Sequence, residues 1–436
     1  MAQDSSRRVR PALGPLVALA LSVCAPRAAA ARDLPFAIEL SVPGGAQGFP
    51  GGPVEARLAV GPGLTVEEAN GVRRAIARLA ADSPPEALQV EVERDATGAP
   101  TGLVLAWVAA PVPAGSAASV RAALVGAETQ VGAPAPEFTL HTIEGGREWR
   151  FEGVPVLGFM FGYDAARHAD TFKTFHHLAG LHGEGWLTKG AGGSYPHQRG
   201  VFVGWDRILV GNQRHDLWTI DEALRPRQEH DTFDLDAERR GPWRARHVSR
   251  ERWLGNGGVK VADERRTGDV WRPTRGALVF DVESALSPRV TTTFAGNPAH
   301  AGVHVRLAEE HFQAGRQASF LLPADAEDHP YDGDSWTARW CAARFRAGDQ
   351  RYVLAQLAHP TNTAPDAPLP VFNARGYGRF GAFTEHRVER AATLTLRHRF
   401  VLLDEAAVPG GVDVALIEAL WRAWVTPPSV TVRRLG

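Results

Sequence analysis

Short runs of alternating apolar and polar residues recur along most of the chain, a pattern typical of β-strands with one buried face. Four such runs precede residue 132, and the two that flank residues 95–98 predict a hairpin with that segment as its turn. Further runs follow from Glu137 onward, separated by turn residues. Because no strand–helix–strand repeat interrupts them, the pattern predicts a mainly all-β fold, an antiparallel sandwich or barrel.

Two segments show helical spacing instead. Residues 65–81 begin with Thr65 as a capping residue, followed by early glutamates and by apolar residues three or four positions apart. Residues 412–424 follow a Gly-Gly break and carry one apolar face. The first segment predicts a helix within a β-rich region. The second predicts an amphipathic helix near the C-terminus, packed across the sandwich.

The titratable and aromatic residues divide the chain into two unlike parts. All sixteen histidines and all five tyrosines lie at or after His141, and residues 132–136 form a break rich in proline and glycine. A chain of 436 residues is also longer than a single core usually supports. We therefore predict a small β-rich domain with one helix over residues 32–132, and a larger β-sandwich domain with the C-terminal helix over residues 137–436.

The first 31 residues have the three parts of an export signal. Three arginines between positions 7 and 10 come first, an apolar run spans residues 13–23, and alanines at positions 28–30 offer a cleavage region. The twin-arginine route and lipidation at Cys24 both stay open, although Val23 stands where a lipoprotein site usually has a small residue. We expect an exported protein, periplasmic or extracellular, that keeps Cys341 as its one thiol.

Composition narrows the classes of partner. The net charge is −1 and no basic stripe with interleaved aromatic residues occurs, so nothing favours nucleic acid. Beyond the export signal no apolar run is long enough to cross a bilayer, so no integral membrane segment is expected in the mature chain. The sequence also lacks a Walker loop, a dinucleotide fingerprint and a Gly-x-Ser-x-Gly elbow. The expected partner is a small molecule or a glycan, and the cofactor is unknown.

The segment WLTKGAGGSYPHQRGVFVGW, residues 186–205, concentrates polar side chains beside flexible glycines. Lys189 is one of only three lysines against 45 arginines, which singles out a compact ammonium at this position. His197 and Arg199 fall on the same side of the strand that follows, and Trp205 ends it. We expect the segment to line a polar cleft in which Lys189 and Arg199 bind a ligand. Trp205 would then serve as an apolar platform, and His197 as an acid or base.

A second polar face is predicted on the strand HAGVHVR, residues 300–306. Because side chains alternate, His300, His304 and Arg306 share one side with Gly302, and the apolar residues share the other. The polar side either lines a cavity, where Gly302 leaves space for a ligand, or is a solvated outer face. In the first case His300 and His304 are candidate catalytic groups, and Arg306 is a ligand clamp.

Metal binding by this strand is disfavoured. His300 and His304 would stand ~13 Å apart at ~3.3 Å per residue, too far for one ion. A mononuclear site would need distant partners such as His197, His230 or His359, so no metal ligand is assigned. His230, in RQEHDTF, and His359, which ends a predicted strand, are instead candidate ligand-binding residues.

Several separated motifs resemble, in order, the PmoA-like family of exported bacterial proteins. They are TFKTFHHL, the segment 186–205, HAGVHVR, LAHPTN and LTLRHRFVLL, and the match covers about residues 137–405. The family commonly reads His-His-Arg-Gly where this chain has Gln198 in place of the second histidine. The resemblance implies a large antiparallel sandwich similar to the galactose-mutarotase-like supersandwich, and a role with carbohydrate. It assigns functional motifs to Lys189, His197, Arg199, His300, Arg306 and His359.

Three functions stay open. The first is an exported carbohydrate-active protein, an epimerase, lyase or hydrolase, in which His197, His300 or His304 acts as an acid or base. The second is a non-catalytic glycan-binding protein. The third is a metal-dependent oxygenase, as the family's label "methane oxygenase PmoA" suggests. That function needs three or more histidines within ligand distance, and the membrane methane monooxygenase subunit is a bundle of transmembrane helices, unlike this chain.

Overall fold

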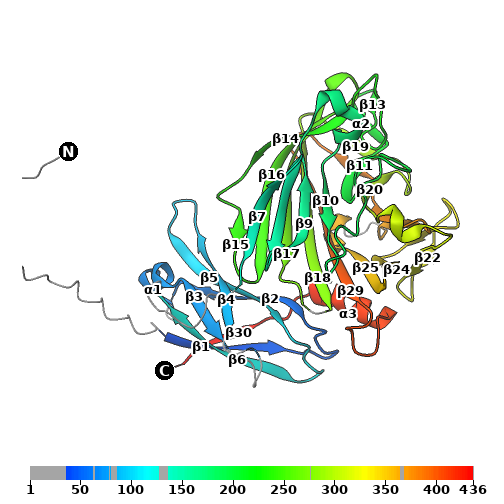
Figure 1. The fold of residues 1–436 in the computed structure, drawn as a ribbon. Coiled ribbons are helices and arrows are strands. Elements are labelled where there is room, and N and C mark those ends of the chain that lie inside the picture. The colour runs from blue at the N-terminus through cyan, green and yellow to red at the C-terminus, as the bar shows by residue number, and fades with distance from the viewer. Residues whose placement is uncertain are drawn as a thin grey trace, which may run out of the picture.

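The computed structural model describes residues 36–61, 64–77, 79, 86–126, 136–274, 276–363 and 368–435 (Figure 1). The predicted export signal lies outside these residues, and so does the predicted linker except for its last residue. The fold is mainly β, as predicted, with large antiparallel sheets and one helix near the C-terminus. Within the described residues, no helix combines the length and the apolar character needed to cross a membrane.

A seven-stranded antiparallel sheet holds six early strands and one late strand, in the order β2-β5-β4-β3-β6-β1-β30 (Figure 1). The hairpin predicted around residues 95–98 is confirmed, since β4 and β5 pair with each other. Its turn is fixed by the Asp95 carboxylate, which accepts hydrogen bonds from the backbone N–H groups of Thr97 (2.8 Å) and Ala99 (3.0 Å). The strands are β1 Phe36–Pro43, β2 Gly52–Ala59, β3 Arg74–Ala77, β4 Glu86–Arg94, β5 Pro100–Ala109, β6 Ala117–Val125 and β30 Thr431–Leu435.

The helix predicted over residues 65–81 is wrong beyond its first turns. α1 spans only Val66–Gly71, and Thr65 caps it as predicted, with its hydroxyl accepting from the Glu68 N–H at 3.1 Å. The chain then enters β3, which pairs with β4 on one side and with β6 on the other. Two neighbouring strands satisfy the backbone of this segment on both edges, and this pairing outweighs a weak local preference for helix.

The last strand departs from the predicted division of the chain. β30, which that prediction assigns to the domain over residues 137–436, pairs antiparallel with β1 and so joins the first sheet. Ala37 lies opposite Leu435, and Ser41 lies opposite Thr431. The first sheet is therefore built from both ends of the described chain.

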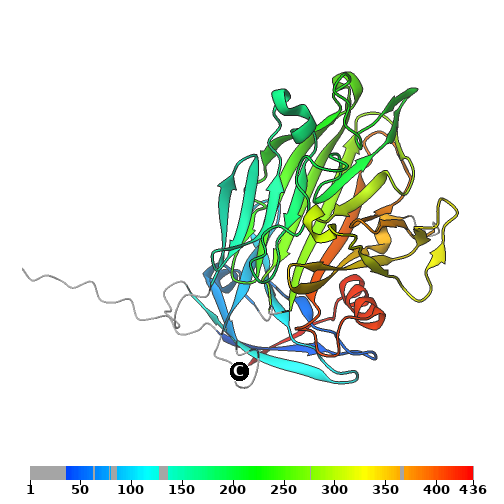
Figure 2. The same cartoon turned by 45° about the vertical axis from the view of Figure 1, so that its right-hand side comes forward.

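Two large sheets face each other in the rest of the molecule (Figures 1 and 2). The first has ten strands in the order β22-β23-β26-β27-β20-β11-β10-β9-β8-β7. Its strands are β7 Phe138–Ile143, β8 Gly146–Phe151, β9 Val154–Met160, β10 Phe175–Leu178, β11 Val201–Trp205, β20 Ala301–Arg306, β22 Glu327–Asp328, β23 Ser335–Thr337, β26 Val371–Arg375 and β27 Arg379–Phe383.

The opposing sheet has nine strands in the order β14-β16-β17-β18-β29-β25-β24-β21, with β15 beside β16, and a separate four-stranded sheet runs β13-β12-β19-β28. The nine are β14 Arg227–Phe233, β15 Arg239–Arg240, β16 Arg244–Leu254, β17 Lys260–Trp271, β18 Ala277–Pro288, β21 Ser319–Leu321, β24 Trp340–Ala347, β25 Gln350–Ala358 and β29 Leu394–Asp404. The four are β12 Arg207–Val210, β13 Gln213–His215, β19 Thr292–Ala295 and β28 His386–Val388. Short helical turns are α2 His168–Thr171, η1 Ala165–Arg167, η2 Asn256–Gly258, η3 Glu309–Phe312 and η4 Pro360–Asn362.

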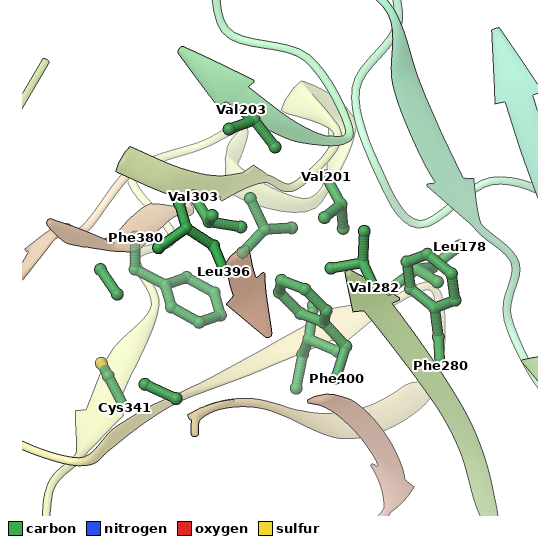
Figure 3. Packing of buried hydrophobic residues seen from close by; sticks show 14 of the residues in the cluster. Leu178, Val201, Val203, Phe280, Val282, Val303, Cys341, Phe380, Leu396 and Phe400 are labelled. Atoms are coloured by element: carbon green, nitrogen blue, oxygen red, sulfur yellow. The ribbon is translucent and has the colours of Figure 1, made fainter. Parts of the chain in front are cut away.

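The main core lies between the two large sheets. Figure 3 shows Val201 and Val203 of β11, and Val303 of β20, pointing toward Phe280 of β18 and Phe400 of β29. None of these five residues is more than 2% exposed. Each such burial stabilises the fold by about 1.5–3 kcal/mol. Because these residues of β11 and β20 face the core, the residues between them face the opposite side of the ten-stranded sheet.

The helix predicted near the C-terminus is confirmed as α3, Val414–Val425, which packs on the outer side of the nine-stranded sheet (Figure 2). Ile417 is fully buried in a cluster with Trp340 of β24. Cys341, which follows Trp340 on β24, points to the other side of the sheet and into the main core. The indole of Trp421 donates a hydrogen bond to the carbonyl of Ala358 at 2.9 Å. The helix therefore covers the second face of a sheet whose first face lines the core.

Arg244, at the start of β16, holds the first sheet against the sandwich. Its guanidinium pairs with Glu55 of β2 and Glu91 of β4, both at 2.6 Å. Burial alone would lower the pKa of Arg244, but Asp269, Glu91 and Glu55 outweigh it and raise the pKa. A buried arginine at this contact is thus fully compensated by carboxylates.

Candidate functional site

The side of β20 that faces away from the main core is polar and shielded from water. All six residues of β20 are buried, so the strand is not a solvated outer face. His304 is 0% exposed and Arg306 is 2% exposed, while His300, just before the strand, is partly exposed. Loops from three distant parts of the sequence cover this face and bring further polar groups to it.

Trp218 lies at the centre of this covering layer. Its ring meets His304 edge-on at 4.8 Å and His300 at 6.1 Å, measured between ring centroids. The ammonium of Lys173 lies 5.1 Å from the same ring, and it donates to the backbone carbonyls of His197 (3.2 Å) and Trp218 (3.0 Å). The indole of Trp218 therefore contacts Lys173, His300 and His304, and Lys173 in turn binds the backbone of His197.

The contacts continue from His304 along the neighbouring strand β27. Arg379 opens β27 directly opposite Arg306, and its guanidinium approaches Nδ1 of His304 at 3.4 Å. The guanidinium of Arg306 lies 4.6 Å over the ring of Tyr377 and donates to the carbonyl of the same residue. Two arginines thus lie side by side at one end of β20.

Tyr195 closes the ring of contacts on the side that faces water. It stacks on Tyr377 at 4.9 Å and meets the ring of His197 at 6.4 Å. Tyr195 is 49% exposed, and His197 and His300 are partly exposed. A ligand arriving from solvent would therefore meet these side chains first.

Backbone hydrogen bonds fix Lys189 and Arg199 beside Arg306. The Arg306 N–H donates to the carbonyl of Gly200 at 2.8 Å, and the Lys189 N–H donates to the carbonyl of Arg306 at 2.9 Å. Residues 186–205 thereby place Lys189 and Arg199 at the same end of β20 as Arg306. The term basic cluster is used below for Lys173, Lys189, His197, Arg199, His300, His304, Arg306 and Arg379.

The cations of the basic cluster bond mainly to neutral groups. Arg199 donates to the backbone carbonyls of Pro196 (2.9 Å) and Asp170 (2.5 Å). Within the described part of the chain, the three arginines and two lysines form one ion pair shorter than 4 Å, between Arg306 and Glu309 at 3.7 Å. The cluster therefore carries more positive than negative charge.

The imidazoles of the cluster are neutral at pH 7. Burial, followed by the charges of Lys173 and His300, lowers the pKa of His197 to about 3. Burial and Arg379 lower the pKa of both His300 and His304. In a neutral imidazole, one nitrogen carries a hydrogen and donates a hydrogen bond. The other nitrogen accepts a hydrogen bond or a proton.

The three histidines differ in what these nitrogens already contact. Nε2 of His304 lies 2.8 Å from the carbonyl of Ala301, and Nδ1 lies against Arg379, so both nitrogens are occupied. Neither His197 nor His300 has a hydrogen-bond partner for its ring among the described residues. Of the three predicted catalytic histidines, these two can therefore accept a proton from a ligand.

Gly302 does not leave space for a ligand, contrary to the prediction. Its φ is +99°, and a Cβ at this position would lie 2.0 Å from the carbonyl oxygen of Ala382 on β27. The missing side chain instead lets β27 approach β20 closely. This approach is what brings Arg379 beside Arg306.

Replacing Gly302 by alanine is expected to destabilise the protein by about 2–3 kcal/mol, because the Cβ meets backbone that cannot move aside. Gly98→Ala is the matched control, since Gly98 also has a positive φ, +83°, but has no atom within 4 Å of a built Cβ. That control should cost only about 1 kcal/mol, the strain of a left-handed backbone. Urea unfolding of both variants measures the difference, and equal midpoints would contradict the assignment.

Trp205 does not contribute to the basic cluster, although it was predicted to. Its ring lies in the main core, 5.8 Å from the ring of Trp253 and 5.0 Å from that of Phe294. The alternation of β11 explains this, because Val201, Val203 and Trp205 all point to the same side. Trp218, rather than Trp205, is the tryptophan in contact with the basic cluster, and it is fully buried.

His230 and His359 also lie apart from the basic cluster. His230, on β14, packs against the rings of Phe161 (4.5 Å) and Phe233 (4.2 Å). His359 precedes η4 and meets Trp424 of α3 at 5.2 Å. Six of the nine predicted site residues therefore converge, namely Lys189, His197, Arg199, His300, His304 and Arg306.

Sequence reasoning missed Trp218, Tyr377 and Arg379. No local pattern marks Trp218, since its neighbours are ordinary turn residues. Arg379 lies within the glycine-rich stretch RGYGRFG, which combines arginine, tyrosine and glycine much as residues 186–205 do. That similarity is the one signal that could have identified the second half of the cluster.

No group of three or more His, Cys, Asp or Glu side chains that could hold a metal ion occurs in the described residues. The metal-dependent alternative predicted from the family label requires such a group. No observation on the described residues therefore supports the metal-dependent alternative.

Comparison with solved structures gives only weak likenesses. A protein of glycosyl hydrolase family 38 from Enterococcus faecalis is 10% identical with a TM-score of 0.38, over 92% of this chain and 47% of that one. A protein provisionally assigned as a kojibiose phosphorylase, from the human microbiome, is 8% identical with a TM-score of 0.27, over 68% and 37%. The chain spans less than half the length of either protein, and neither likeness carries a functional argument.

No curated protein matches the chain. A family model does match, over residues 148–420, and its description gives no function. It does not carry the PmoA-like label, which stays a prediction. The matched segment includes every member of the basic cluster and more than half of the sequence. The chain therefore belongs to the family of unknown function DUF6807.

Proposed function

We propose that the basic cluster is the sugar-binding site of an exported protein, and that His197 and His300 transfer protons during conversion of the sugar. The observation that supports this most is the convergence of six predicted polar residues around Trp218, with two neutral and unpartnered imidazoles on the side that faces water. Sugars carry hydroxyl groups that bond to imidazoles and ammonium groups, and they have apolar C–H faces that pack on aromatic rings such as Tyr195.

The chemistry of the cluster favours proton abstraction over hydrolysis. A neutral imidazole can take a proton from carbon once a bound anion raises its pKa from the low value that burial and the nearby cations impose on His197, and those cations stabilise the negative charge that then develops. Glycoside hydrolysis usually uses two carboxyl groups. Here Asp216 is occupied by the N–H groups of Trp218 (2.7 Å) and Thr219 (2.9 Å), and Glu309 lies beside Arg306. We therefore favour an epimerase or lyase.

Proton abstraction can be detected without knowing the product. In D₂O, a sugar that is a substrate should exchange a carbon-bound hydrogen for deuterium, which proton NMR records as loss of one signal. Asn in place of His197 keeps a polar side chain that donates and accepts hydrogen bonds but cannot act as a base, so His197→Asn should lower the exchange rate by about 100-fold or more. His141→Asn, at an exposed position on β7, is the control and should exchange at the normal rate.

Two other results would revise the proposal. Exchange at an equal rate in the wild type and in His197→Asn would remove His197 from the mechanism. Saturable binding of a sugar with no exchange in either protein would favour the non-catalytic glycan-binding alternative.

A further inference from the structure

Buried arginines elsewhere in this protein are paired with carboxylates. Arg266, whose side chain is 1% exposed, donates to Glu264 at 2.9 and 2.7 Å. Burial would lower the pKa of Arg266, but Glu264 and Glu251 outweigh it and raise the pKa. Arg244 shows the same behaviour at the contact with the first sheet. The fold thus supplies carboxylates where a buried cation serves structure.

The basic cluster is the opposite case. Lys173, Arg199 and Arg379 are each at most 2% exposed, and none has a carboxylate within 4 Å among the described residues. Burial lowers the pKa of all three, to about 10 for Arg199. Burial also lowers the pKa of Arg306 and that of Lys189, although the charge of Glu309 raises both in part. Five basic side chains are therefore held close together, and Glu309 is the one carboxylate that forms an ion pair with any of them among the described residues.

Two guanidinium groups of the cluster also have unused donors. Nε of Arg306 and Nε of Arg379 are buried without any hydrogen-bond partner in the described structure. Nε of Arg244 is also unpartnered, but carboxylates surround that arginine. Arg379 has no carboxylate within 4 Å among the described residues, so a group outside the chain is the candidate partner for its donors. Because Arg306 and Arg379 lie opposite each other on adjacent strands, a ligand group that reached one would also lie near the other.

Building on the proposed sugar site, we infer that its ligand is an anionic sugar, whose carboxylate, sulfate or phosphate group supplies the counter-charge that the basic cluster lacks. A neutral sugar could bond to single donors but would leave most of the positive charge of the cluster uncompensated. An anionic group would accept from Arg306 and Arg379 with paired, charge-assisted hydrogen bonds. The hydroxyl groups of the sugar would then extend toward His300, His197 and the tyrosines.

The test compares sugars that differ only in charge. Isothermal titration calorimetry would be run with glucose, glucuronate, glucose 6-sulfate and glucose 6-phosphate, each in low and in high salt. At least one anionic sugar should bind about 10-fold or more tightly than glucose, and its affinity should fall as salt screens the charges. The three anionic sugars separate carboxylate, sulfate and phosphate as the source of the charge.

Variants connect the effect to the cluster. Arg379→Gln should weaken binding of the anionic sugar by about 30-fold or more, as expected when one partner of a buried charge pair is removed, and should weaken binding of glucose much less. Lys189→Gln is a second variant with the same expectation. Arg346→Gln, on the exposed side of β24, is the control and should bind normally. The thermal midpoint of ligand-free Arg379→Gln should not fall, because the lost charge had no partner to lose.

The outcomes separate this inference from the proposed function. Equal affinity for glucose and all three anionic sugars would overturn the inference but leave a sugar site in place. No binding of any sugar would overturn the proposed function itself. A large fall in thermal midpoint for both Arg379→Gln and Lys189→Gln would show that these cations are structural, which also contradicts the inference.

Discussion

Acidification from pH 7 to about pH 4 is expected to unfold the protein, because several buried histidines are neutral in the folded state. Burial lowers the pKa of His247 and His398 to about 3 and that of His177 to about 4. His247 lies 3.0 Å from His176, nitrogen to nitrogen, and His398 contacts Gln356 (3.2 Å), so neither has room for an added charge. In the unfolded chain each histidine has a pKa near 6.5.

The direction of the change in stability follows from how many protons the folded and the unfolded chain bind at each pH. Between about pH 6.5 and the lowered pKa, the unfolded chain binds a proton that the folded chain refuses, so stability falls as the pH falls. Each histidine contributes about 1.4 kcal/mol per pH unit, and three contribute about 4. The free energy of unfolding of a folded protein is about 5–15 kcal/mol, so a loss at this rate would unfold the protein within a few pH units. Burial raises the pKa of Glu251 and Asp269, which acts in the opposite direction and moderates the slope.

Tryptophan fluorescence and near-ultraviolet circular dichroism along a pH series would measure this unfolding. Urea unfolding at several pH values between 7 and 5 would give the number of protons taken up, expected to be more than three because burial also lowers the pKa of His197, His304 and His386. His247→Gln should lower that number by about one, whereas His141→Asn, exposed on β7, should not change it. A stability that is independent of pH over this range would contradict the neutral state of the buried histidines.

Replacing Glu264 by glutamine is expected to destabilise the protein by about 3–5 kcal/mol, since it leaves the buried Arg266 without its counter-charge. Glu264 is 2% exposed and accepts hydrogen bonds from the Trp253 indole (2.7 Å), the Ser284 hydroxyl (2.5 Å) and the Arg266 guanidinium. Glutamine has the same shape but turns one of these acceptors into a donor that faces other donors.

Glu283→Gln, on the neighbouring strand β18, is the matched control for this change on β17. Glu283 pairs with Arg397 at 2.7 Å, but both side chains are substantially exposed, so its removal should cost less than about 1 kcal/mol. Urea unfolding of the two variants at pH 7 measures both costs. A similar small loss for both would show that Arg266 is not dependent on Glu264.

The alternation of apolar and polar residues was enough to predict the antiparallel sandwich and the inward side of its strands. It also identified which residues of the strand around His304 share a face, because that periodicity is local. Pairing between distant strands does not depend on a local pattern, and the prediction of a helix beyond Gly71 is wrong for this reason. Residues 74–77 form β3 because they pair with β4 and β6, and their own sequence does not indicate this pairing.

The candidate site was predictable to the same extent. Lys189, His197 and Arg199 were found through an unusual density of polar residues beside glycine. What covers β20, and hence whether its polar face meets water or a buried cluster, depends on loops that come from far along the chain. Trp218 and Arg379 reach the site only through that packing, so no spacing in the sequence could indicate them.

The pairing of β30 with β1 imposes an order on biosynthesis. The ribosome delivers β1 early, yet the strand that covers its free edge emerges only after the roughly 300 residues between Val125 and Thr431 have been made. At about 5–20 residues per second this interval lasts on the order of 15–60 s. Throughout it, β1 offers unpaired N–H and C=O groups to any other nascent chain. Synthesis of β30 is thus the event that allows this edge of the first sheet to be covered.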